Sequence, residues 1–198
     1  MQSKNPTRQY HADEFLICAG CILFRRTPVP KPPSIDGIPN GHTHTRLEVC
    51  LLRHTIRDEW LLPKGRKDRD ESITATAIRE TYEESGYPCI LLPISLRTRA
   101  PASGAQTKDC VELVERSCEP FMMTMRQVAD RNVKMIWWFV AVVEGEKVTG
   151  TQTLVESYES QFFDVQEAVE KATFQSDRDV IETAVGIVKD TFGDGTLI

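Results

Sequence analysis

A short segment rich in carboxylates constrains this chain more than any other feature. It runs from Gly65 to Tyr87 and reads GRKDRDESITATAIRETYEESGY. Glu80, Glu83 and Glu84 are spaced i, i+3, i+4, so a helix would place all three carboxylates on one face. Such like-charged neighbours cost about 0.2–0.5 kcal/mol per pair unless a counter-charge is present. A divalent cation such as Mg²⁺ or Mn²⁺ would supply that charge, and a solvated acidic helix face is the simpler alternative.

The residues around these glutamates favour the metal site. They follow the pattern G-x5-E-x7-R-E-U-x-E-E-x-G-U, where U is bulky and apolar, at Gly65, Glu71, Arg79, Glu80, Glu83, Glu84 and Gly86. This pattern is the Nudix box, and the chain resembles the Nudix hydrolase family. Thr81 and Tyr87 depart from the two U positions, which pack rather than react. Thr81 is therefore expected to seat the helix slightly less well.

The resemblance implies metal-dependent hydrolysis of a diphosphate linked to another moiety, by attack of water on phosphorus. Divalent ions neutralise the diphosphate and lower the pKa of bound water, and positioning and charge stabilisation supply the rest. The resemblance implies Glu80 and Glu84 as metal ligands, and Glu83 as a ligand or as the base that activates water. The backbone carbonyl groups of Lys64 and Gly65 would complete the coordination, since glycine permits a close approach.

Other residues are expected to support this chemistry. The resemblance implies that Glu71 and Arg79 hold the helix against the preceding loop, with the guanidinium forked onto a carboxylate. A surface pair between Arg79 and Glu83 is the alternative. In several members of the family the general base lies on a later loop. Glu156 and Glu159, in the segment LVESYESQFF, are the candidates for that catalytic role, with two solvated glutamates as the alternative.

Length and charge narrow the class of protein. The chain has 198 residues and a net charge of −5, which suit one domain with a substantial core and disfavour nucleic acid or anionic membranes as partners. No apolar run reaches the roughly 18 residues of a membrane span, and the N-terminus lacks a signal-peptide apolar region. We expect a cytoplasmic protein that acts on a phosphorylated small molecule. A nuclear location and secretion after removal of a leader are alternatives, and oligomeric state has no signal.

The cysteines are expected to be core thiols rather than a metal or redox site. There are six: Cys18, Cys21, Cys50, Cys89, Cys110 and Cys118. Most lie in apolar, strand-like segments, as buried free thiols do. Cys18 and Cys21 have C-x-x-C spacing, but a strand would point them to opposite faces, and no second pair accompanies them. Free thiols indicate an intracellular, reducing compartment.

The order of predicted elements is typical of an α+β fold. Residues 1–13 are expected to form a flexible leader, 14–192 a single Nudix domain with a Pro-rich insertion loop at 27–45, and 193–198 a tail. Strands are predicted at 14–26, 46–54, 59–63, 89–97, 111–116 and 135–144, a loop or short helix at 122–129, and helices at 72–85, 163–172 and 176–192. The resemblance implies a mixed β-sheet sandwiched between α-helices.

The helix predicted at 72–85 carries the box. Asp70 is the predicted N-cap, and Gly86 is the predicted residue that ends the helix. The predicted packing stripe consists of apolar residues at helical spacing: Ala75, Ile78 and Tyr82.

Basic residues near the box are candidates for substrate phosphates. Six lie close to it in the predicted order of elements: Lys64, Arg66, Arg53, Arg97, Arg99 and Lys134. The approach LPKGR, in place of the P-G-G of many nucleotide sanitisers, resembles diadenosine and diphosphoinositol polyphosphate hydrolases and also mRNA-decapping enzymes. A diphosphoinositol polyphosphate is the first expected substrate, and a diadenosine polyphosphate is the alternative.

Three other interpretations are compatible with the sequence. An aromatic clamp for a nucleobase would come from Trp60, Trp137, Trp138 or Phe139, although Trp137 and Trp138 would face opposite ways in one strand. Decapping would need an RNA channel, which the acidic balance disfavours. A non-catalytic Nudix-fold binding module is the alternative of another class, but degenerate members of the family usually lose box glutamates, and these are intact here.

Overall fold

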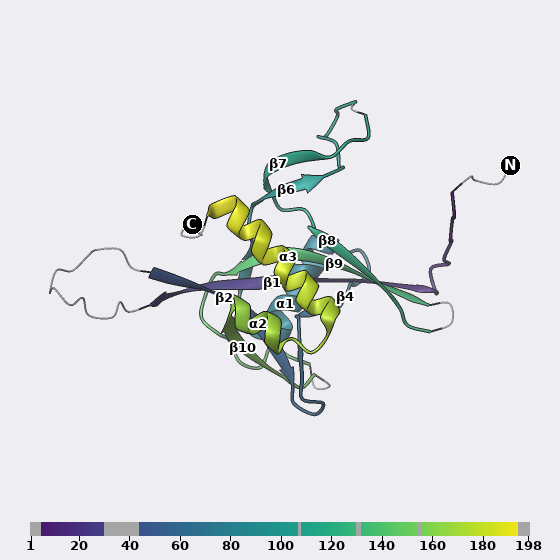
Figure 1. The fold of residues 1–198 in the computed structure, drawn as a ribbon. Helices are drawn as coiled ribbons and strands as arrows, with labels where there is room; N and C mark the ends of the chain where they lie inside the picture. The colour runs from purple at the N-terminus through teal and green to yellow at the C-terminus, as the bar shows by residue number, and fades with distance from the viewer. Residues whose placement is uncertain (1–4, 30–43, 107, 130–131, 154–155, 194–198) are drawn as a thin grey trace.

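The computed structural model describes residues 5–29, 44–106, 108–129, 132–153 and 156–193. Figure 1 shows the strands and helices of these ranges. The strands are β1 (Phe15–Val29), β2 (His44–His54), β3 (Glu59–Leu61), β4 (Lys64–Arg66), β5 (Cys89–Leu91), β6 (Ile94–Thr98), β7 (Glu112–Ser117), β8 (Met122–Gln127), β9 (Val133–Val143) and β10 (Tyr158–Asp164). The helices are α1 (Ile73–Ser85), α2 (Val165–Lys171) and α3 (Gln175–Phe192). No helix in these ranges is long and apolar enough to cross a membrane.

A mixed sheet forms the centre of the molecule. Its strand order is β10-β2-β1-β9-β5, with β3 beside β2, β4 beside β1 and β8 beside β9. Strands β1 and β9 run parallel, and the other pairs of this sheet are antiparallel. Helix α1 packs on one face, and α2 and α3 pack on the other. The predicted α+β class and the helix–sheet–helix sandwich are therefore confirmed.

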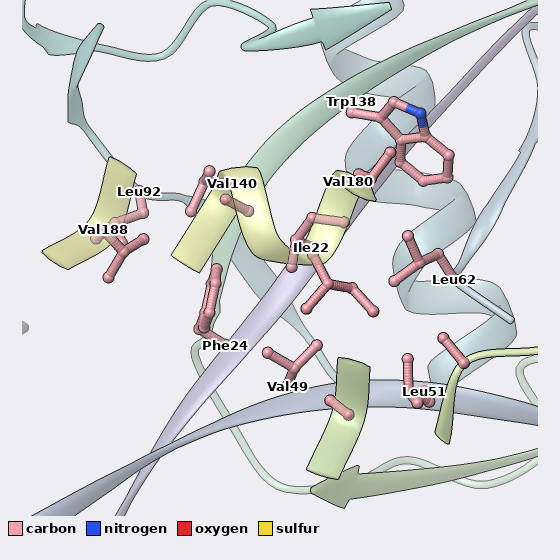
Figure 2. Close-up of a cluster of buried hydrophobic side chains, with 14 of the residues drawn as sticks. Ile22, Phe24, Val49, Leu51, Leu62, Leu92, Trp138, Val140, Val180 and Val188 are labelled. Carbon is pink, nitrogen blue, oxygen red and sulfur yellow. The ribbon is translucent and has the colours of Figure 1, made fainter. Parts of the chain in front are cut away.

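The central strands divide their side chains between two cores, as the two-residue period of a strand requires. Cys18 and Ile22 of β1 join the core under α3, whereas Cys21 joins the core under α1. On β9, Trp138 belongs to the first core and Trp137 packs against the second. Figure 2 shows the first core, with Ile22 and Trp138 among its labelled side chains. The prediction that neighbouring cysteines and tryptophans face opposite ways is confirmed.

Two predicted segments have a different structure. The single strand expected at 89–97 is divided at Leu92 and Pro93, where proline has no N–H to continue a ladder. Its first part, β5, joins the central sheet, and its second part, β6, pairs with β7 in a separate two-stranded sheet. Residues 122–127 form strand β8 rather than a loop or short helix, because they pair with β9.

Two further boundaries differ from the predictions. Strand β10 occupies 158–164, so helix α2 begins at Val165 rather than at 163. Strands β1 and β2 extend into the predicted insertion loop at 27–45, and pair there as far as Val29 and His44. The rest of that loop, residues 30–43, lies outside the described ranges.

Helix α1 begins later than its predicted cap. The N-cap is Ser72, whose Oγ accepts the N–H of Ala75 at 3.0 Å. Asp70 is not the cap and instead has a left-handed φ of 62°. Gly86 ends the helix in the left-handed conformation, with a φ of 80°, as predicted.

The buried face of α1 is mostly polar, and of the predicted apolar stripe only Ile78 packs against the core under α1. Ala75 is exposed, and Ile78 and Tyr82 are only partly buried. The helix instead buries small or hydrogen-bonding side chains: Thr76, Ala77, Glu80, Thr81, Glu84 and Ser85. The ordinary rule for an amphipathic helix fails here because this helix presents carboxylates to the protein interior.

Thr81 connects this helix to the central strand. Its side chain is fully buried, and its Oγ1 accepts the N–H of Cys21 at 3.0 Å. Strand β1 pairs with β4 as far as Gly20 and with β2 from Phe24 onward, so Cys21 lies in the gap between the two partners. The Thr81 hydroxyl accepts a backbone N–H in that gap. Thr81, which stands where the box pattern has an apolar residue, therefore forms a hydrogen bond that joins the helix to the sheet.

Replacing Thr81 with valine should destabilise the protein although the shape of the side chain is kept. The N–H of Cys21 would lose its acceptor, and a buried unsatisfied donor costs about 1–3 kcal/mol. Thr81→Ser, which keeps the hydroxyl, is the control and should lose less. Urea denaturation measures both, and a valine variant as stable as the wild type would contradict this role.

Candidate metal centre

Three carboxylates from two distant parts of the chain meet beside helix α1. Glu80 and Glu84 lie about one turn apart on α1 and are 7% and 5% exposed. Glu156, which precedes β10, joins them, and one oxygen atom from each residue lies within 4.8 Å of the others. Carboxylate oxygens that converge in this way form a ligand set for a hard divalent cation.

The segment that carries Glu156 is fastened to the last carbonyl groups of α1. The Thr151 hydroxyl donates to the Glu83 carbonyl at 2.8 Å, and the Gln152 amide donates to the Glu84 carbonyl at 3.0 Å. The Ser160 hydroxyl of β10 donates to the Ser85 carbonyl at 2.6 Å. The C-terminal carbonyls of a helix have no partner within the helix, so these bonds both satisfy them and set the position of Glu156.

Strand β4 brings backbone atoms against the same carboxylates. The N–H of Lys64 donates to Glu84 Oε2 at 2.7 Å. A Cβ atom at Gly65 would lie 1.8 Å from Glu80 Oε2, so no side chain fits there. Because β4 pairs with β1, the central sheet sets this close approach.

Burial places the carboxylates where negative charge is costly. Desolvation raises the pKa of Glu84 to about 8; the charge of Lys64 opposes the rise, and Glu80 and Glu156 add to it. Desolvation also raises the pKa of Glu80, against the opposing effect of Arg79. A cation between these groups would offset both burial and mutual repulsion. The donor set therefore fits Mg²⁺ or Mn²⁺, which prefer oxygen ligands.

Arg79 ties the site together. Its Nε and Nη2 atoms donate to the two oxygens of Glu71 at 2.8 and 2.9 Å. Its Nη1 donates to Glu80 at 2.7 Å and to Glu83 at 3.0 Å, and Nη2 also donates to the Arg66 carbonyl at 2.9 Å. Hydrogen bonding to Arg79 lowers the pKa of Glu71 to about 2. The contact with Glu83 is therefore part of a network that joins α1 to β4.

The other candidate glutamates are not members of this group of converging oxygen atoms. Glu83 has a side chain that is 34% exposed, and its Oε2 is the oxygen that receives Arg79. Glu159 is exposed on β10, and its Oε2 lies 3.8 Å from Arg53 Nη1. Of the two later glutamates, the structure thus brings Glu156 and not Glu159 to the carboxylates.

Three of the six basic candidates lie near these carboxylates. Lys64 and Arg66 flank Gly65 on β4. Lys134 lies on β9, where burial lowers its pKa and the charge of Lys64 lowers it further, while Glu84 has the opposite effect. These mutual effects show that Lys134 extends toward the same region.

The other three basic candidates are engaged or distant. Arg53 donates to Asp58 at 2.7 Å, and Arg99 donates to Asp109 at 2.9 Å. Arg97 lies on β6, in the two-stranded sheet that Figure 1 shows at the top of the view, away from α1 and β4. The structure does not bring these residues to the carboxylates.

Arg126 is a basic residue near the site that is absent from the predicted set. It lies opposite Lys134 in the β8–β9 ladder. Because a loop or short helix is expected at 122–129 from the sequence, nothing there places it beside Lys134. The alternation of Met123 and Met125 with Thr124 and Arg126 is a weak strand signal that would have found it.

The chain is similar to proteins of one known family over much of its length. The NUDIX domain family matches residues 32–184. An 8-oxo-(d)GTP phosphatase of Mycolicibacterium smegmatis is 36% identical over 73 residues, which are 37% of this chain and 20% of that protein. Nudix hydrolase 12, mitochondrial, of Arabidopsis thaliana is 26% identical over 121 residues, which are 60% of this chain and 56% of that protein. The chain thus spans less than two thirds of the length of these relatives.

A solved structure has the same fold. The crystal structure of a C. elegans Ap4A hydrolase binary complex matches with a TM-score of 0.53 and 17% identity, over 88% of this chain and 98% of that chain. At this identity the likeness concerns the arrangement of strands and helices.

Replacing Gly65 with alanine should disrupt the site more than the fold. The new Cβ would overlap the Glu80 carboxylate, so either β4 or Glu80 must move, and metal-dependent activity should fall by at least about tenfold, since ligand misplacement of about 1 Å costs more than that. Gly186→Ala in helix α3 is the matched control, because nothing lies within 4 Å of its Cβ position. Unaltered Mg²⁺ binding by Gly65→Ala, measured by calorimetry, would contradict this account.

Replacing Glu84 with glutamine should separate metal binding from folding. The folded protein without metal binds the Glu84 proton more tightly than the unfolded chain, so its free energy of unfolding should fall as pH rises from about 4.5 to about 8. Glu84→Gln removes that loss, and one pKa unit is worth about 1.4 kcal/mol, so the variant should gain at least that much over the wild type at about pH 8 in EDTA.

Thermal melting with EDTA and with excess Mg²⁺ tests both parts. Mg²⁺ should raise the Tm of the wild type at about pH 8, where Glu84 must be ionised to bind it, and should raise the Tm of Glu84→Gln far less. Equal Mg²⁺ shifts in the two proteins would remove Glu84 from the ligand set.

Proposed function

This chain belongs to the Nudix family, and on that premise we propose that it hydrolyses a phosphoanhydride bond in a highly phosphorylated small molecule with the help of a divalent cation. One observation carries the proposal: the buried carboxylates of Glu80 and Glu84 and the half-buried carboxylate of Glu156 converge within 4.8 Å beside the cationic residues Lys64 and Lys134. Carboxylates bind the cation, and cations bind the remaining phosphate charge.

Glu80, Glu84 and Glu156 are the proposed ligands for Mg²⁺, with Mn²⁺ as the alternative. The backbone carbonyls of Lys64 and Gly65 are proposed to complete the set, which is supported by the approach of β4 to both helix carboxylates. A bound divalent cation would neutralise the diphosphate and lower the pKa of water at the site. Arg79 acts by orienting Glu80 rather than by touching the substrate.

Glu83 is the proposed general base. Its Oε2 is engaged by Arg79 Nη1 at 3.0 Å, and no hydrogen bond of the described residues occupies its Oε1. That oxygen is available to take a proton from the attacking water, and the Glu83 side chain is more exposed than Glu80 and Glu84. Glu156 is the alternative base because it comes from a later loop. Glu159 is disfavoured because it is not one of the converging carboxylates and it pairs with Arg53.

A diphosphoinositol polyphosphate is the first proposed substrate, and a diadenosine polyphosphate is the second. The aromatic residues considered for a nucleobase clamp support this order. Trp138 and Phe139 are buried in the two cores, and Trp60 and Trp137 are partly buried against them. A substrate without aromatic rings needs no such clamp, and its phosphate groups match the cationic residues beside the carboxylates.

Glu83→Gln and Glu156→Gln should fail in different ways. Loss of a general base lowers kcat by about 10²–10⁴-fold, so Glu83→Gln should lose that activity while Mg²⁺ affinity stays near the wild-type value. Glu156→Gln should weaken Mg²⁺ binding, and excess Mg²⁺ should restore part of its activity. Phosphate release and calorimetric titration with Mg²⁺ measure the two effects, and the opposite pattern would exchange the proposed roles.

The substrate is tested with wild-type protein and Mg²⁺ on a panel of 5-diphosphoinositol pentakisphosphate, diadenosine tetra- and pentaphosphate, ADP-ribose and capped RNA. Selective hydrolysis of 5-diphosphoinositol pentakisphosphate supports the proposed order of the two substrates. Selective hydrolysis of the diadenosine compounds makes a diadenosine polyphosphate the first substrate instead. If folded, metal-loaded protein hydrolysed none of them but bound one, a non-catalytic binding module would replace the enzyme.

A further inference from the structure

A pair of cations stands at an open end of the central sheet. Arg126 on β8 and Lys134 on β9 are directly opposite in the antiparallel ladder, and Lys134 is in register with Leu16 of β1. Residues in register present their side chains on the same face of a sheet. Ile136, two residues after Lys134, lies in the core under α3, so this is the α3 face. Leu16 is 42% exposed, which shows that the helix leaves this end of the face uncovered.

These like charges destabilise the sheet if nothing neutralises them, because cations directly opposite each other repel. Lys64 of β4 adds a third charge on the same face, because it lies opposite Gly20 of β1, and Gly20 is in register with Trp138 of the core under α3. Burial lowers the pKa of Lys134, and the charges of Lys64 and Arg126 lower it further. Within the described ranges, no ion pair joins any of the three to an acid. Such a group of cations on a chain with a net charge of −5 does not stabilise the fold. It is better explained as a site that binds an anionic ligand.

One buried acid lies close to this group but is already engaged. Asp177, at the start of α3, is 4% exposed. Desolvation raises its pKa, whereas the charges of Lys64 and Arg126 and a hydrogen bond with the backbone of Leu62 lower it. Asp177 therefore anchors the start of α3 to the chain before β4. A single carboxylate also leaves most of the positive charge of the group uncompensated.

The cations adjoin the metal carboxylates. The charge of Glu84 acts on Lys134, and both the charge and the N–H of Lys64 act on Glu84. Lys64 thus lies between the carboxylates and the other two cations: Glu84 accepts a hydrogen bond from its backbone N–H, and its side-chain charge acts on Lys134. Positive charge therefore continues from the edge of the carboxylate cluster through Lys64 and Lys134 to Arg126.

We propose that Lys64, Lys134 and Arg126 form a subsite for phosphate groups beyond the scissile diphosphate, and that this subsite selects substrates with additional phosphates over diphosphates whose second moiety is uncharged. The inference rests on the proposed function. Arg126 is a specificity-determining residue in this scheme and takes no part in the bond cleavage. Its contact exists in the bound ground state and in the transition state alike, so its loss raises KM and leaves kcat nearly unchanged.

Arg126→Gln tests the subsite, because Arg126 is exposed and its removal relieves repulsion rather than opening a cavity. Arg116→Gln is the matched control, an exposed arginine on β7 in the separate two-stranded sheet. For diadenosine pentaphosphate and 5-diphosphoinositol pentakisphosphate, Arg126→Gln should raise KM by at least about tenfold, the equivalent of one charged contact. For ADP-ribose the KM should change by less than about twofold, because this diphosphate has no further phosphate to bind Arg126, so no binding interaction is lost. Arg116→Gln should match the wild type with every substrate.

A second measurement does not depend on turnover. Inorganic tetrapolyphosphate is titrated calorimetrically into the wild type, Arg126→Gln, Lys134→Gln and Arg116→Gln in EDTA, with thermal melting to verify folding. The wild type and Arg116→Gln should bind it equally. Arg126→Gln and Lys134→Gln should bind it at least about fivefold more weakly, and the difference should shrink at high salt because the attraction is electrostatic.

The outcomes separate the subsite from the proposed function. An active wild type together with an Arg126→Gln variant that changes all substrates equally, or none, would overturn the subsite and leave the hydrolase intact. If the wild type hydrolyses nothing on the panel, the proposed function fails and the calorimetry still decides: weaker tetrapolyphosphate binding in Arg126→Gln supports the anion site, and unchanged binding refutes it.

Discussion

Glu80 and Glu84 are buried between helix α1 and strand β4, and a buried carboxylate costs several kcal/mol unless it is paired or hydrogen-bonded. The protein meets this cost in two ways. Arg79 donates hydrogen bonds to Glu80, to Glu71 and to the Arg66 carbonyl of β4. The Lys64 N–H donates to Glu84. The compensation is incomplete, because the pKa of Glu84 is still raised to about 8. A divalent cation would offset this remaining cost of burial and the repulsion from Glu80 and Glu156.

The rest of the local structure follows from bringing these carboxylates to the sheet. Helix α1 buries small and polar residues instead of an apolar stripe, and Thr81 joins it to β1 through the Cys21 N–H. Gly65 has no room for a side chain because Glu80 occupies that space. The carbonyls at the end of α1 accept hydrogen bonds from the segment before Glu156 and from β10. Folding of the two distant segments therefore brings together the three carboxylates of the proposed ligand set.

Positive charge lies beside the negatively charged carboxylates. The carboxylates lie on the side of α1, while Lys64, Lys134 and Arg126 lie toward the start of α3, and β4 is where the two groups meet. A polyphosphate with a bound cation carries the complementary pattern, with positive charge at the metal and negative charge along the remaining phosphates. This match supports the proposed class of substrate more directly than the overall fold does, since one fold supports many reactions.

The sequence by itself determined the features that depend on local spacing. The helical period of 3.6 residues places Glu80 and Glu84 on one helix face, and the two-residue period of a strand points Cys18 and Cys21 to opposite faces. Glycine, which lacks a Cβ atom, accounts for the end of the helix at Gly86 and for the close approach at Gly65. The cap at Ser72 instead of Asp70 shows the limit of such rules, since both residues can cap a helix and only one has the required backbone conformation.

Only the tertiary structure decided which distant residues join the site. Glu156 rather than Glu159 reaches the carboxylates, Arg126 stands beside Lys134, and Arg97 is carried away on a second sheet. Each outcome depends on which strands pair and in which register. Strand pairing is set by burial and hydrogen bonding between segments far apart in the chain, so the residues concerned carry no local signal of the partners that they will meet.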